Sequence, residues 1–132
     1  MLIPPILELM LVGVREPGVP NNERILLRVI EGTNLAQYGI IVGIRNEAGM
    51  ITPMQDYFFW FGEQEVISTP AWLIVYTGPG NFKVTNDVNT NDLIYIMHWG
   101  RQYTMFNSSN IVPVVINIGG ILVGNLSLPA PS

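Results

Sequence analysis

The chain has 132 residues, enough for one domain with its own core, and it contains no cysteine, which excludes disulfides, thiol catalysis and thiolate-ligated zinc. Asp, Glu, Lys and Arg make up 12% of the residues, about half of the share in ordinary soluble domains, and mean hydropathy is +0.34. Net charge is −4 and the six basic residues are scattered along the chain, so we expect no nucleic-acid partner.

The first segment, residues 6–14, is an apolar run that follows Pro4 and Pro5. No Lys or Arg precedes Arg15, the two prolines interrupt the apolar residues, and Glu8 lies among them. These features are not those of a secretory signal peptide, and no segment reaches the roughly 20 apolar residues of a spanning helix. We therefore expect a strand here, in a protein that is made in the cytoplasm and does not insert into a membrane.

The rest of the chain repeats one pattern, in which short apolar runs rich in β-branched residues end at Gly, Pro, Asn or Asp. No stretch of a dozen residues places apolar side chains at helical spacing, so the pattern predicts an all-β fold. Seven to eight short strands at this spacing are typical of a two-sheet β-sandwich. The predicted strands are Ile6–Val14, Arg24–Ile30, Tyr38–Ile44, Tyr57–Phe61, Ala71–Tyr76, Leu93–Trp99, Ile111–Ile118 and Ile121–Leu126.

This order divides the chain into three regions. Residues 1–22 form an N-terminal extension of one strand and a loop, residues 23–126 form the β-sandwich domain, and residues 127–132 form an extended, proline-rich tail. Residues 77–92 are expected to form a long polar loop. The last strand is entered through Gly119-Gly120, which is a hairpin signal.

Two runs, YFFWF at 57–61 and AWLIVY at 71–76, are apolar on both faces of a strand. One face can fill the space between two sheets, and the other needs a cover. A covering N-terminal segment is one solution. We favour a homo-oligomer or a larger assembly of protein partners, with the N-terminal strand exchanged with or packed on a partner as one version. The candidate interface residues are Ile6, Leu9, Leu11, Phe58, Trp60, Trp72, Val123 and Leu126.

Catalytic constellations are weak. The chain has one histidine, His98, and no GxSxG nucleophile motif, so a Ser-His-Asp triad would have to be assembled from distant segments. Glu63 and Glu65 are two residues apart in a polar turn, where solubility is the simpler explanation. We therefore expect no enzyme and no cofactor.

A weak calcium candidate lies in DVNTND, where Asp87, Asn89 and Asn91 match the first oxygen ligands of a calcium loop. The match then fails, because Asp92 stands where the loop needs glycine and His98 stands where it needs a bidentate glutamate. Asn and Asp also stabilise turns by bonding their own backbone, which is the favoured explanation.

Aromatic side chains leave a second function open. If several of them shared one exposed sheet face, they could stack on a sugar, and the domain would be a carbohydrate-binding or surface adhesion module. The candidates for this role are Trp60, Trp72, Trp99, Tyr76 and Tyr103.

Three stretches resemble the lamin-tail domain, an immunoglobulin-like β-sandwich. They are ERILLRVIEGTNLAQYGIIVG (23–43), YFFWFGEQEVISTPAWLIVYTGPG (57–80) and IYIMHWGRQYTMFNSSNIVPVVINIGGILV (94–123), and small bacterial and phage-borne proteins carry similar strings. The chain departs from the pattern in its first 22 residues, at STPAW and beyond GGILV. The residues at matching places are Asn34, Leu35, Tyr38, Phe59, Phe61, Val66, Val75, Gly80, Trp99, Gly100, Asn107 and Gly120.

Lamin-tail domains are non-catalytic interaction modules. The resemblance therefore implies an immunoglobulin-like sandwich that acts as a structural or protein-interaction subunit. With its low charge and apolar ends, the chain would suit a virion or phage particle, as a capsid decoration or connector component.

Overall fold

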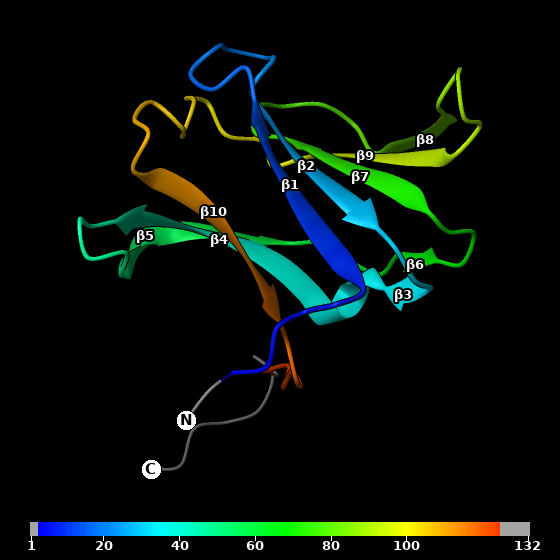
Figure 1. Cartoon of the computed structure of the whole chain (residues 1–132), viewed down its shortest axis with the longest axis horizontal. Helices are drawn as coiled ribbons and strands as arrows, with labels where there is room; N and C mark the ends of the chain where they lie inside the picture. Colours follow the sequence, from blue (N-terminus) through cyan, green and yellow to red (C-terminus); the bar gives the residue numbers. More distant parts are fainter. Residues whose placement is uncertain (1–2, 125–132) are drawn as a thin grey trace.

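The computed structural model describes residues 3–124, which are all-β, as the sequence predicts (Figure 1). Its helical content in this range is a single 3-10 turn, η1 (Leu35–Gln37), and no helix there is long and apolar enough to cross a membrane. The strands are β1 (Leu9–Arg15), β2 (Arg24–Val29), β3 (Thr33–Asn34), β4 (Tyr38–Arg45), β5 (Ile51–Trp60), β6 (Glu65–Val66), β7 (Ala71–Tyr76), β8 (Lys83–Asn86), β9 (Leu93–His98) and β10 (Ile111–Asn117).

The described strands form a large sheet, β1-β2-β7-β9-β8, a small sheet, β10-β4-β5, and the short pair β3-β6. In the view of Figure 1 the large sheet lies above the small one. Neighbouring strands are antiparallel except β7 and β9, which run parallel. A parallel pair needs a crossover connection, and residues 77–92 supply it. The arrangement is compatible with a β-sandwich.

Strand alternation builds the core between the two sheets. On β2 and β7, the buried residues Leu27, Leu73 and Val75 alternate with half-buried ones, while β4 buries Ile40 and Val42 from the opposite sheet. These side chains belong to one apolar cluster. Burying such aliphatic residues contributes about 1.5–3 kcal/mol each, so this cluster is the main source of stability.

The predicted aromatic alternation on β5 is confirmed. Tyr57 and Phe59 pack against the core, and Phe61, just after the strand, is buried. Phe58 and Trp60 point the other way and are exposed.

The predicted strand Ile121–Leu126 does not form in the described part of the chain, where residues 118–124 carry no strand. Ile121, Leu122 and Val123 are exposed there, so their side chains lack the neighbours that stabilise a strand. The apolar run predicts a strand because such residues favour a sheet, but the run does not specify a neighbouring strand with which it would pair. Residues 125–126 and the predicted tail at 127–132 lie outside the described residues.

Other boundaries also differ from the prediction. The polar loop expected at 77–92 contains β8, whose four residues are exposed, so no apolar alternation marks it. The strand β5 begins at Ile51, ahead of the predicted Tyr57, and the positive φ of 65° at Asp56 accompanies a break in its register with β4. The strand in the N-terminal extension, β1, pairs with β2 of the same chain from Leu9 to Arg15.

Candidate protein-interaction surfaces

The outer surface of the small sheet is apolar. Because Ile40 and Val42 point into the core, Ile41 points outward, and Phe58 and Val114 lie beside it on the neighbouring strands. Among the described residues, Arg45 shares this side of β4 at the end of the sheet, opposite Ile51, and the residues around Ile41 and Phe58 are apolar. We name this surface the small-sheet face, formed by Ile41, Ile51, Phe58, Trp60, Val112, Val114 and Ile116.

The two aromatic residues on the small-sheet face are held in place by their surroundings. The ring of Phe58 lies against Gly39, where a Cβ atom would come within 2.7 Å of its Cε1. Trp60 donates from Nε1 to the carbonyl of Ala36 at 2.8 Å. Phe58 is 48% exposed and Trp60 40% exposed, so both present a fixed apolar surface to solvent.

The outer face of the large sheet is more covered by its own chain. The guanidinium of Arg28 lies 4.5 Å from the ring centroid of Trp72, across the strand pair β2–β7, and also bonds Asp92 at 2.5 Å. Trp72 is half-buried as a result. Trp72 therefore has an intramolecular partner, whereas Phe58 and Trp60 keep open ring surface.

His98 lies on this same outer face, between two covering groups. Its ring stacks on Tyr76 with centroids 5.2 Å apart, and the backbone of Gly80 lies directly against the ring. The Nδ1 atom is buried and has no hydrogen-bond partner among the described residues. No aspartate or serine of residues 3–124 orients the imidazole, so the contacts around it are those of a packed aromatic group.

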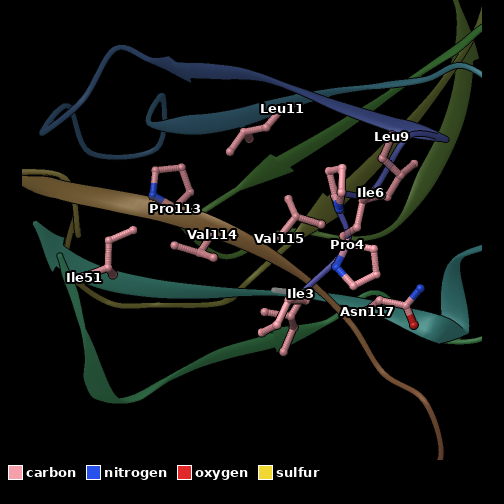
Figure 2. A pocket seen from close by; sticks show the side chains of 12 residues that line it. Ile3, Pro4, Ile6, Leu9, Leu11, Ile51, Pro113, Val114, Val115 and Asn117 are labelled. Atoms are coloured by element: carbon pink, nitrogen blue, oxygen red, sulfur yellow. The ribbon is translucent and has the colours of Figure 1, made fainter. Parts of the chain in front are cut away.

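An apolar groove lies between the N-terminal segment, β1 and β10, and we call it the β1–β10 groove. Figure 2 shows Leu11 of β1 facing Pro113 and Val114 of β10 across it. The groove has a volume of about 690 Å³, and none of the described side chains that line it is charged. Three predicted interface residues, Ile6, Leu9 and Leu11, come together here, although Leu9 is only 6% exposed and is part of the core.

The other candidate interface residues do not join one surface. Val123 is 87% exposed on the segment after β10, and Leu126 lies outside the described residues. The structure thus distributes the predicted residues over the small-sheet face, the large-sheet face, the groove and the C-terminal segment.

The calcium candidate forms a self-bonded turn. The Asp87 carboxylate accepts from the backbone N–H of Asn89 at 2.8 Å and of Thr90 at 3.4 Å, and Asn91 has a positive φ of 62°. Within residues 3–124 no group of three or more His, Asp or Glu side chains is placed to hold a metal ion. The hydrogen bonds are those of an Asx-type turn.

The aromatic residues proposed for sugar stacking do not form one row. Trp72 and Tyr76 share the large-sheet face, Trp60 lies on the small-sheet face, and Trp99 packs against the core. Tyr103 is 82% exposed on a loop.

One buried polar site is not indicated by the sequence. Glu23 is 1% exposed, and its carboxylate accepts from the backbone N–H of Gly18 at 2.7 Å, of Met105 at 2.8 Å and of Phe106 at 3.0 Å, and from the Thr77 hydroxyl at 2.8 Å. It ties three loops to one end of the large sheet. A glutamate just before a strand carries no sequence signal that separates it from a solvated residue.

Comparisons of the chain with protein-family models, with curated proteins and with solved structures gave no match.

Proposed function

We propose that the chain is a non-enzymatic structural or protein-interaction subunit of a larger assembly, and that the small-sheet face is a contact surface of that assembly. The observation that carries the proposal is the exposure of Phe58 and Trp60, at 48% and 40%, on a face with seven apolar residues. Contiguous apolar surface of this kind is typical of protein interfaces, where aromatic anchors dominate the binding energy.

The low charge of the chain supports the same proposal. A domain with 12% charged residues has few groups with which to keep apolar faces solvated, and a neighbouring chain removes that need. Two side chains of types that often act in catalysis make structural contacts instead. The Glu23 carboxylate accepts hydrogen bonds from backbone N–H groups, and the His98 ring stacks on Tyr76.

The finer assignment follows from the sequence. We propose an immunoglobulin-like, lamin-tail-like sandwich on the three motif stretches, and incorporation into a virion or phage particle on the low charge and apolar ends. Carbohydrate binding is the alternative, and it draws less support because its candidate aromatic residues are spread over several surfaces.

A charge placed on the small-sheet face is expected to weaken self-association. Phe58→Glu would put a carboxylate into the proposed contact, where an unpaired charge is costly, and we expect the association constant to fall at least tenfold. Sedimentation velocity over a range of protein concentrations measures it. Phe82→Glu is the matched control, because Phe82 is 46% exposed but lies on a loop away from this face.

Equal association of the Phe58→Glu, Phe82→Glu and unmodified proteins would contradict the proposed contact surface. A thermal melt of each variant separates lost association from lost folding.

A further inference from the structure

The β1–β10 groove lies between two open sheet edges. Among residues 3–124, β1 and β10 each pair with one neighbour, β2 and β4 respectively, so each leaves one edge without a partner strand. An open edge presents backbone N–H and C=O groups that an added strand can bond. The groove therefore combines an apolar lining with the backbone groups needed for strand addition.

The segment that follows β10 has the complementary character. Ile121, Leu122 and Val123 are 68%, 102% and 87% exposed, and none is charged. Gly119 and Gly120 precede them, with open space where a Cβ atom would stand, so the turn between β10 and these residues is sterically unrestricted. We call residues 119–124 the C-terminal arm.

We propose that the C-terminal arm of one copy adds as a strand in the β1–β10 groove of a second copy. The inference deepens the proposed assembly function and depends on it, since it names the partner and the site. Alternate residues of an added strand face opposite ways, so Ile121 and Val123 can enter the groove together while Leu122 lies on the other side. Such an exchange of a segment between copies is a common route to homo-oligomers.

The position of the arm favours binding in the groove of a second copy over binding in the groove of its own chain. Asn117, the last residue of β10, is part of the groove lining, and the apolar side chains of the arm that follows it are exposed. An intramolecular hairpin through Gly119-Gly120 would bury them on β10, and the described residues form no such hairpin. The groove and the arm, both without charged side chains among the described residues, are therefore both free to contact a neighbouring molecule.

Cysteine cross-linking tests the exchange, because the natural chain contains no cysteine. A full-length Val123→Cys protein is mixed with a full-length Leu11→Cys protein under mild oxidation, so that a disulfide between the two can form only across molecules. Disulfides require the two Cα atoms to lie within about 7 Å. We expect at least tenfold more mixed dimer than from Val88→Cys with Leu11→Cys, in which a 96% exposed loop residue replaces the arm residue.

Each result decides between arrangements. Mixed dimers at the level of the Val88→Cys control would overturn the arm exchange. A Leu11→Cys/Val123→Cys double variant that forms its disulfide within a monomer would also overturn it, because the arm would then occupy its own groove. If the unmodified protein is still oligomeric in either case, the proposed assembly function survives; if it is monomeric, both proposals fail.

Discussion

Replacing Glu23 with alanine is expected to lower the free energy of unfolding by about 4 kcal/mol, since two buried backbone N–H groups and one part-buried N–H group would lose their acceptor at about 1–3 kcal/mol each. Water that enters the site would offset part of this loss. The groups belong to Gly18, Met105 and Phe106, in loops that are far apart in the sequence. Glu23→Gln keeps the shape and one oxygen, so its loss is expected to be smaller, at about 2 kcal/mol. Urea denaturation followed by tryptophan fluorescence measures both.

Glu47→Ala is the control for this prediction, because Glu47 is exposed in a turn. Surface substitutions of this kind usually change stability by less than about 0.5 kcal/mol. If Glu23→Ala and Glu47→Ala unfolded at the same urea concentration, the Glu23 carboxylate would not stabilise the loops, although its hydrogen bonds connect them.

Gly39→Ala is expected to cost about 2 kcal/mol of folding stability, because the small sheet has no room for a Cβ atom at this position. The added atom would come within 2.7 Å of the Phe58 ring and 2.8 Å of the backbone carbonyl oxygen of Phe59. Rotating the Phe58 side chain relieves the first contact, but the second involves the backbone of the paired strand. The variant should therefore both melt earlier and displace Phe58 from the small-sheet face.

Gly119→Ala is the matched control, since its Cβ atom would meet nothing within 4 Å. Thermal unfolding by circular dichroism compares the two variants. If Gly39→Ala and Gly119→Ala had the same melting temperature, the small sheet would be able to open around residue 39, which would contradict the close packing of Gly39 against Phe58 and Phe59.

Alternation along single strands could be predicted from the sequence. The inward residues of β2 and β7 and the two faces of β5 follow from the period of two, because the apolar residues themselves carry that signal. The strand β8 carries no such signal, since Lys83–Asn86 is exposed and is held by pairing with β9. The parallel pairing of β7 with β9 depends on the path of the connection at residues 77–92, and the amino-acid composition of that connection does not specify its path.

The candidate surfaces were predictable only in part, for a related reason. The sequence marks Phe58, Trp60 and Trp72 as equivalent aromatic residues on two-sided strands. Their difference arises from strand register, which places Arg28 opposite Trp72 and leaves Phe58 over Gly39. Likewise, the groove requires β1 and β10 to come together although some 95 residues separate them, a long-range placement that no local pattern specifies.

Whether the chain assembles with copies of itself is decided by the native mass of the unmodified protein, measured by light scattering across a wide concentration range. We expect a mass that is a multiple of the 14.7 kDa chain, because an apolar sheet face and an open apolar groove are both left for neighbouring molecules. A mass of 14.7 kDa at every concentration would contradict it.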